Sequence, residues 1–197
     1  MAIAINGSGT VTGISVGGLP DGIVDTDMLA AAAVTAPKRG TGGILQVVTA
    51  TYSTEVSTTS STYSDTGLTC NITPASSSNK VLVLVSQSYR TQRGTDVANG
   101  GIRILRDSTA IVSSAQLASD GQAYGISVAA TGSGASEMTM KSVWSRMYLD
   151  SPNTTSAVTY KTQHAAYNQN NSNQFRTQYS ASSTNESSYI ILIEVAG

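Results

Sequence analysis

Most of the chain alternates short apolar runs with turns rich in Ser, Thr, Asn and Gly, a pattern typical of β-strands. From residue 44 onward nine such runs follow one another, with no helical pattern between them. The expected strands are 44–52, 66–73, 80–90, 101–106, 109–114, 136–149, 157–165, 174–180 and 188–195. Strands without interleaved helices favour antiparallel sandwiches and jelly rolls. We therefore predict an all-β chain whose main domain is an antiparallel β-sandwich or jelly roll.

The pattern also indicates how the strands are layered. Residues 80–85 and 189–193 are apolar on both faces, as expected of strands at the centre of two packed layers. Residues 157–163 alternate between apolar and polar side chains, which predicts one face in water. Residues 106–109 lie between two apolar runs and predict a tight hairpin.

The first 43 residues have a different texture and predict a separate N-terminal segment. Short β-like stretches at 2–5 and 10–16 flank a turn, and an Ala-rich run predicts one short helix near 25–34. So short a helix is marginal alone in water. We therefore expect copies of the segment to pack together, and we divide the chain into domains at 1–43 and 44–197.

Composition narrows the function classes. The chain has 197 residues, of which 40% are hydrophobic, 12% are charged and roughly a quarter are Ser or Thr. A net charge of −1 leaves no electrostatic footprint for nucleic acid. No apolar run approaches the length of a membrane-spanning helix. We therefore expect no nucleic-acid partner and no membrane insertion.

Candidate catalytic and metal-binding residues are sparse. Residues 13–17 match the Gly-x-Ser-x-Gly elbow of hydrolases but lack the strand–turn–helix context that this motif needs. His164 and Cys70 are the single residues of their types, too few for a zinc site. We interpret His164 as a core or edge histidine and Cys70 as a small core residue. The prediction is a non-enzymatic chain with no cofactor.

Two groups of charged residues allow more than one interpretation. Asp21, Asp25 and Asp27 are interpreted as a helix cap and linker turn, with a metal shared on a threefold axis as the alternative. Four arginines are clustered in sequence, at positions 90, 93, 103 and 106. Strand alternation and nearby aspartates favour a solvated, salt-bridged face over a groove for polyanions.

One loop is a candidate carbohydrate site. A run of amide side chains between two strands is flanked by aromatic residues. Amides pair with hydroxyl groups, and an aromatic ring stacks on the apolar side of a sugar, although a solvated turn has the same composition. The candidate glycan-binding residues are Tyr167, Asn168, Asn170, Asn171 and Phe175.

Three segments resemble a known family. Residues 17–40, from Gly-Gly-Leu-Pro-Asp-Gly to Pro-Lys-Arg-Gly, resemble the N-terminal linker of small bacteriophage tail-fibre proteins. Residues 148–161 and 188–197 resemble the head domain of the same proteins, and the similarity is greatest to those of marine phages and cyanophages.

The resemblance implies a homotrimeric virion protein, assembled in the host cytoplasm and exposed on the extracellular particle. Residues 1–43 would attach to another virion structural protein, and the C-terminal β-sandwich head would perform host attachment as a receptor-binding domain for host-surface carbohydrate. The apolar residues expected to serve attachment and trimerisation are Ile3, Ile5, Ile14, Val16, Met28, Leu29 and Ala32.

Two other functions stay open at this point. The chain lacks the long repetitive shaft of larger fibres, so a capsid-decorating fibre or a tail adaptor that stabilises the particle without receptor recognition is the alternative. A polysaccharide depolymerase is disfavoured, because nothing in the sequence orders two carboxylates into a glycosidase pair.

Overall fold

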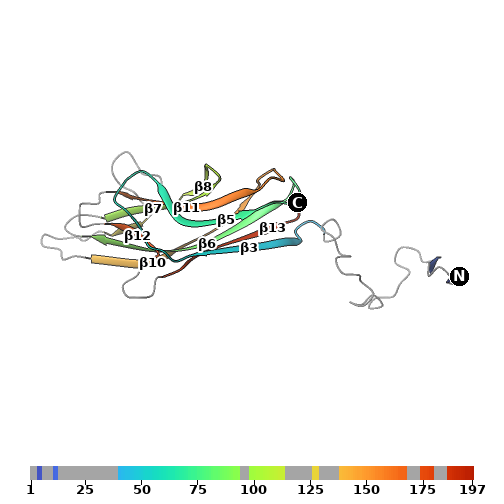
Figure 1. Cartoon of the computed structure of the whole chain (residues 1–197), viewed down its shortest axis with the longest axis horizontal. Helices are drawn as coiled ribbons and strands as arrows, with labels where there is room; N and C mark the ends of the chain where they lie inside the picture. The colour runs from blue at the N-terminus through green and yellow to red at the C-terminus, as the bar shows by residue number, and fades with distance from the viewer. Residues whose placement is uncertain are drawn as a thin grey trace. The chain divides into compact units, whose positions relative to one another are not determined.

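The structure is a computed structural model that describes residues 4–5, 11–12, 40–93, 98–113, 126–128, 138–167, 174–179 and 186–197. Every regular element in these ranges is a β-strand (Figure 1). The strands are β1 (Ala4–Ile5), β2 (Val11–Thr12), β3 (Ile44–Tyr52), β4 (Val56–Thr58), β5 (Ser64–Ile72), β6 (Lys80–Arg93), β7 (Ala98–Arg106), β8 (Thr109–Ser113), β9 (Ile126–Val128), β10 (Met138–Asp150), β11 (Val158–Tyr167), β12 (Phe175–Thr177) and β13 (Ser188–Val195).

The chain divides into two compact units, Met1–Arg39 and Gly40–Gly197. Within the first unit the structure describes an antiparallel pair, in which β1 and β2 lie in register from Ala4 opposite Thr12. This pair flanks the predicted turn. The helix expected near 25–34 lies outside the described residues. Of the residues expected to serve attachment and trimerisation, Ile5 lies in β1, and the structure describes none of the other six.

The larger sheet of the second unit has six strands, and the long strand β6 organises it. One edge of β6 pairs with the whole length of β10, from Val81 opposite Asp150 to Arg93 opposite Met138. The other edge pairs first with β13 and then with β12. Beyond these, β3 pairs with β13 and β4 pairs with β12, and every pairing is antiparallel.

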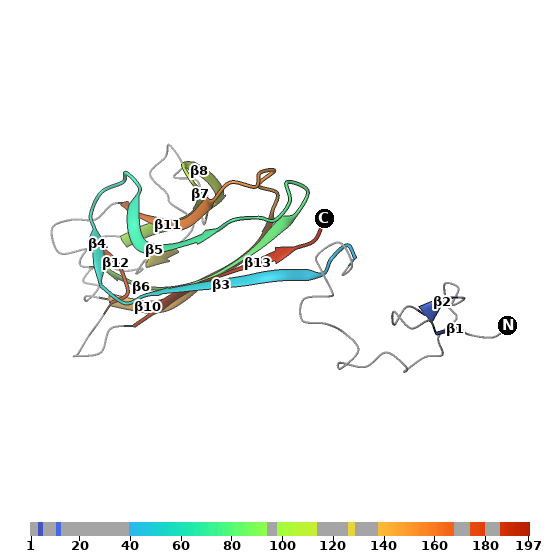
Figure 2. The same ribbon diagram turned by 45° about the vertical axis from the view of Figure 1, so that its right-hand side comes forward.

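The smaller sheet has five strands in the order β5-β11-β7-β8, with β9 paired to β7. Figure 2 shows β5, β11, β7 and β8 in one layer and β3, β6, β10 and β13 in the other. Both sheets contribute to a single hydrophobic core, with Ile102 and Tyr160 from the smaller sheet and Val83, Ile190 and Leu192 from the larger one, all inaccessible to solvent. Burial of such side chains contributes about 2 kcal/mol each, so this shared core is the main source of stability.

The strand prediction from the sequence is confirmed as an all-β fold with antiparallel sheets. Residues 44–52 and 188–195 form β3 and β13 with the predicted bounds, and each of the other seven expected runs overlaps a strand. The predicted hairpin joins β7 to β8, with Arg106 opposite Thr109 and a positive φ of 53° at Asp107. The prediction missed β4 and β9, which have three residues each.

The buried carboxylate of Glu194 fixes the end of the larger sheet that lies beside the turn between β5 and β6. Glu194 is fully buried in β13, where it accepts hydrogen bonds from the Ala75 backbone N–H (2.7 Å), Asn79 Nδ2 (2.6 Å) and Gln46 Nε2. These donors come from β3 and from the turn between β5 and β6. Charge-assisted hydrogen bonds of this kind satisfy the carboxylate and hold the turn against the sheet.

Candidate functional site

The face of the larger sheet that points away from the core carries a band of apolar side chains. In cross-strand register, Val47 on β3 lies opposite Ile193 on β13, which lies opposite Leu82 on β6, which lies opposite Leu149 on β10. Directly opposed residues project from the same face of a sheet. These four side chains therefore form one continuous apolar row across four strands.

The next row along the strands continues the band. It consists of Thr49, Ile191, Leu84 and Met147, again in direct register across β3, β13, β6 and β10. Met147 is 69% exposed, and no position of either row carries a charge. We call these two rows the apolar face. Exposed apolar surface that spans several strands is characteristic of an interaction site.

The apolar face explains why residues 80–85 of β6 and 189–193 of β13 are apolar on both sides. Both strands are central in the sheet, since β13 lies between β3 and β6, and β6 lies between β13 and β10. One side of each packs in the core, as Val83 and Leu192 do. On the other side Ile191 is 36% exposed. The second apolar side is thus left uncovered by the described part of the chain.

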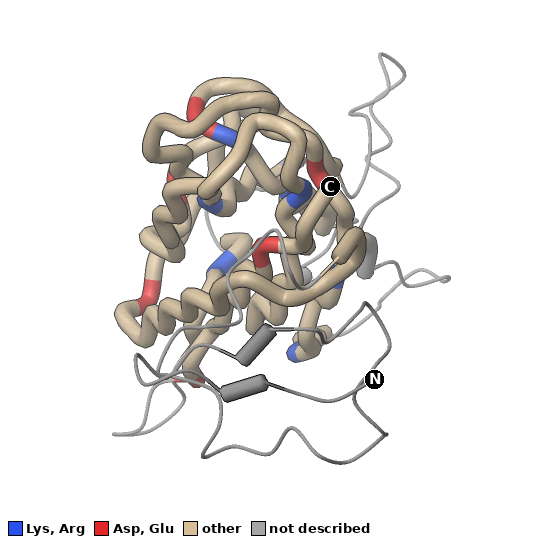
Figure 3. Tube along the Cα trace, turned by 90° about the vertical axis from the view of Figure 1, so that its right-hand side faces the viewer, with Lys and Arg blue, Asp and Glu red and all other residues tan. Residues whose placement is uncertain are grey.

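A second feature of the same face is a line of positive charges. Arg176 on β12 lies directly opposite Arg90 on β6, which lies directly opposite Lys141 on β10. We call these three residues the cation row. Arg90 is six residues from Leu84 along β6, which places the row about 20 Å from the nearer row of the apolar face. Figure 3 shows that charged residues are few and scattered along the described trace. Three cations in direct cross-strand register are unusual against this background.

The ring of Tyr179 lies among these cations. The guanidinium carbon of Arg90 is 4.4 Å from the ring centroid, Lys141 Nζ is 4.6 Å from it, and the guanidinium carbon of Arg176 is 5.6 Å from it. All three distances lie within the range of cation–π attraction. Arg176 also forms an ion pair with Glu55, at 3.0 Å.

The amide-rich loop predicted to bind glycans is only partly within the described structure. Tyr167 ends β11, and Asn168, Asn170 and Asn171 lie outside the described residues. Phe175 begins β12 with its side chain fully buried, stacked on Tyr89 at 5.6 Å between ring centroids. A buried ring offers no face to a sugar, so Phe175 is a core residue and not a glycan contact.

A glycine on the facing strand explains why the Phe175 ring packs in the core. Gly100 on β7 lies against the Phe175 ring, and a Cβ at that position would overlap the ring. The absence of a side chain at Gly100 therefore creates the space for the ring between the two sheets. Tyr179, which was not among the predicted site residues, lies beside three charged groups. The residues next to Tyr179 in the sequence do not indicate this environment, because two of its three charged neighbours, Arg90 and Lys141, come from β6 and β10.

His164 and Cys70 are core residues, as predicted. His164 is inaccessible to solvent, its ring lies edge-on to Phe175 at 6.1 Å, and burial lowers its pKa to about 4. Neither ring nitrogen has a hydrogen-bond partner among the described residues. Burial raises the pKa of the Cys70 thiol. In the described ranges, no three His, Cys, Asp or Glu side chains gather into a possible metal site.

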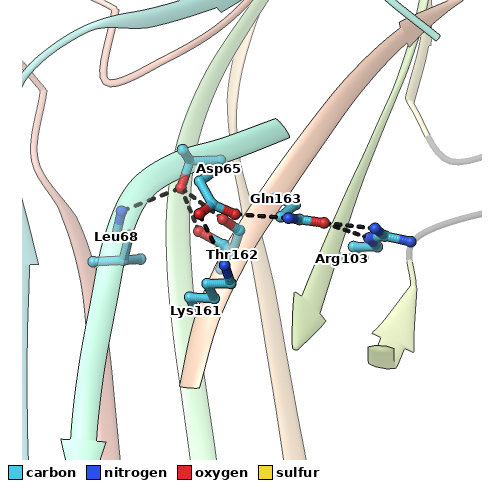
Figure 4. Close-up of polar contacts among 7 residues, drawn as sticks. Asp65, Leu68, Arg103, Lys161, Thr162 and Gln163 are labelled. Atoms are coloured by element: carbon cyan, nitrogen blue, oxygen red, sulfur yellow. Dashed lines mark hydrogen bonds and ion pairs between the residues drawn. The ribbon is translucent and has the colours of Figure 1, made fainter. Parts of the chain in front are cut away.

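The arginines that are clustered in sequence are divided between the two sheets. Arg103 on β7 donates to Gln163 Oε1 at 2.6 and 2.9 Å, and Gln163 in turn donates to Asp65 at 2.7 Å (Figure 4). Arg106 forms an ion pair with Asp150 at 2.9 Å. Arg106 thus forms an ion pair, as predicted, but its partner Asp150 is buried and the pair does not lie on a solvated face. Arg90 belongs to the cation row of the other sheet.

Comparisons with known proteins add no assignment. No protein-family model matches the chain, and no curated protein matches it. Within the described residues, no helix is long and apolar enough to span a membrane. Any function must therefore be argued from the two features of the larger sheet.

Proposed function

We propose that this chain is a non-enzymatic virion protein, a homotrimeric phage tail fibre. Its C-terminal domain, Gly40–Gly197, is a β-sandwich head of the jelly-roll kind that adsorbs to host-surface glycans, and its N-terminal segment attaches to another virion protein. The observation that carries the proposal is the apolar face, because a solvent-exposed virion protein needs a partner to cover such a surface.

Other copies of the same chain are the partner that fits this face best. The two rows contain Val, Ile, Leu, Met and Thr and no charged residue. Identical faces brought together by symmetry would therefore meet without like-charge repulsion. Interfaces between identical subunits are depleted in charge at their centre and more apolar than the remaining surface, and the apolar face has this composition.

The strand at one edge of the face supports the same assignment. Within the described residues β10 pairs on one side only, with β6, and Val143, Met147 and Leu149 are each about half exposed or more. A long, apolar edge strand in a monomer would be prone to uncontrolled pairing. Contact with a neighbouring copy would cover it.

Multivalency supports the glycan-binding part of the proposal. Three heads on one fibre, and several fibres on one particle, would convert weak sugar contacts into strong adsorption. The chain suits such contacts, because it is rich in hydroxyl and amide side chains and carries a net charge of only −1.

The test is to label particles that carry the gene for this chain with an antibody against the full chain and to image them. Label at the tail tip, together with loss of adsorption when the antibody blocks it, is the expected result. Label spread over the capsid, with adsorption unchanged, would instead favour the decorating role. Absence of label from every particle would contradict a virion function.

A further inference from the structure

The three positive charges of the cation row repel one another, so the sheet needs other interactions that offset this repulsion. Arg176, Arg90 and Lys141 are direct cross-strand neighbours on three adjacent strands. Like charges directly opposite one another destabilise a sheet. Adjacent strands lie about 4.8 Å apart, so the row extends over roughly 10 Å.

The described contacts compensate only part of this charge. Tyr179 supplies one aromatic ring for all three cations, and Glu55 supplies one carboxylate, which pairs with Arg176. Arg90 Nη2 donates to the neutral side chains of Gln92 and Thr139. Counted over the described residues, three cations against one carboxylate leave a local excess of two positive charges, on a chain whose net charge is −1.

The guanidinium groups are incompletely hydrogen-bonded. The Nε atoms of Arg90 and Arg176 have no acceptor among the described residues, but they are buried and cannot themselves contact a ligand. The ammonium of Lys141, by contrast, is on an exposed side chain. A planar guanidinium presents several N–H donors that match the two oxygens of a carboxylate or the oxygens of a sulfate.

The geometry points to the cation row as a binding site for acidic sugars, in which Arg90, Lys141 and Arg176 bind the carboxylate or sulfate groups of a polysaccharide while Tyr179 holds the cations in line. That this polysaccharide belongs to the host surface rests on the proposed function. The binding of acidic sugars does not, since it follows from the charges and donors alone.

The dimensions of the row favour a polysaccharide over nucleic acid. A row of roughly 10 Å spans one or two sugar units. Nucleic-acid binding needs a wide basic surface that neutralises many phosphates, and the balance of 11 basic against 12 acidic residues disfavours one. An acidic polysaccharide with spaced charges matches three aligned cations better.

The experiment titrates the full-length chain with three polymers of matched length: polygalacturonate, dextran sulfate and neutral dextran. Calorimetry at about 0.15 M salt should detect binding of one or both acidic polymers and not of dextran. The variant Lys141→Gln should weaken that binding about fivefold, since one charge-assisted contact is lost. The matched control is Lys80→Gln, which removes another exposed lysine of the larger sheet outside the row and should leave binding unchanged.

Several outcomes would overturn the inference. These are binding of neutral dextran as tightly as of the acidic polymers, equal losses in the two variants with unchanged melting temperatures, or no binding of either acidic polymer. Binding of a DNA duplex as tight as that of the acidic polymers would overturn the assignment to polysaccharide. A trimer that adsorbs to host cells but ignores acidic polymers would refute this inference alone. A monomer that binds them would refute the trimer and leave this site intact.

Discussion

The Asp150 carboxylate at the end of β10 accepts a 2.7 Å hydrogen bond from the Tyr160 hydroxyl of β11, across the boundary between the two sheets. Arg106 of β7 donates to both oxygens of the same carboxylate, at 2.9 and 3.0 Å. Asp150 and Tyr160 are buried, so the contact is shielded from water. One carboxylate of the larger sheet is therefore held by two residues of the smaller sheet.

Replacing Tyr160 by phenylalanine removes this hydrogen bond and keeps the buried ring. We expect Tyr160→Phe to lower the free energy of unfolding by about 1 to 2 kcal/mol, since Asp150 loses a buried donor. Denaturant titration measures the change. The matched control is Tyr189→Phe, on an exposed ring, which should change stability by less than about 0.5 kcal/mol. Equal effects of the two substitutions would show that the inter-sheet contact adds nothing.

The same contact predicts a loss of stability at alkaline pH. Burial, followed by the hydrogen bond and the negative charge of Asp150, raises the pKa of Tyr160 above its usual value near 10. The contribution is complete below pH 10 and declines above it, because the unfolded chain then releases a proton that the folded chain retains. Unfolding measured from pH 8 to 11 should show a steeper decline for the native chain than for Tyr160→Phe. Parallel curves would contradict the assignment.

His164 predicts a loss of stability on the acid side. Burial lowers its pKa from 6.5 to about 4, so the unfolded chain binds a proton over this interval while the folded chain does not. The contribution is present above pH 6.5 and declines as pH falls towards 4, by about 3 kcal/mol in total. His164→Leu should flatten the stability curve over this interval. Carboxylates titrate in both proteins, so their effect cancels in the difference, and an unchanged slope would refute the prediction.

Glu194 is expected to stabilise the turn between β5 and β6. Glu194→Ala leaves the donors of Ala75, Asn79 and Gln46 without their acceptor, and we expect the free energy of unfolding to fall by about 3 kcal/mol. Chemical denaturation measures this loss. Glu186→Ala removes an exposed carboxylate and serves as the control, with an expected change near zero. A loss below about 1 kcal/mol for Glu194→Ala would mean that water replaces the carboxylate.

The apolar face can be tested by placing a charge within it. Met147→Glu puts a carboxylate at the most exposed apolar position of β10, where it costs little in a monomer but would be buried in an interface. We expect the association constant of the oligomer to fall at least about tenfold, measured by sedimentation velocity. Thr69→Glu, at an exposed position of the smaller sheet, should leave association unchanged. Equal association of both variants would exclude the apolar face as the interface.

The parts of the fold that could be predicted from the sequence are those with a long periodic signal. Ile44–Tyr52 and Ser188–Val195 are nine and eight residues long and rich in β-branched residues, and their bounds agree with the prediction. Val56–Thr58 and Ile126–Val128 are too short to show a period of two. Their strand character depends on the neighbours with which they pair.

The candidate sites depend on register, which sequence spacing does not reveal. Arg90, Lys141 and Arg176 are separated by 35 residues or more along the chain, and strand pairing alone brings them into one row. The polar loop before Phe175 predicts an exposed ring. In the structure the ring is buried, because Gly100 has no side chain and leaves space for it in the core. The sequence shows that β6 and β13 are apolar on both sides. It does not show that the described part of the chain leaves one of these sides uncovered.

The most direct test of the central claim is the mass of the full-length chain in solution. Sedimentation equilibrium at micromolar concentration should give three times the chain mass of 20.3 kDa, and the Met147→Glu variant should shift that mass towards the single chain. A native chain that sediments at 20.3 kDa over the whole concentration range would contradict the trimeric fibre.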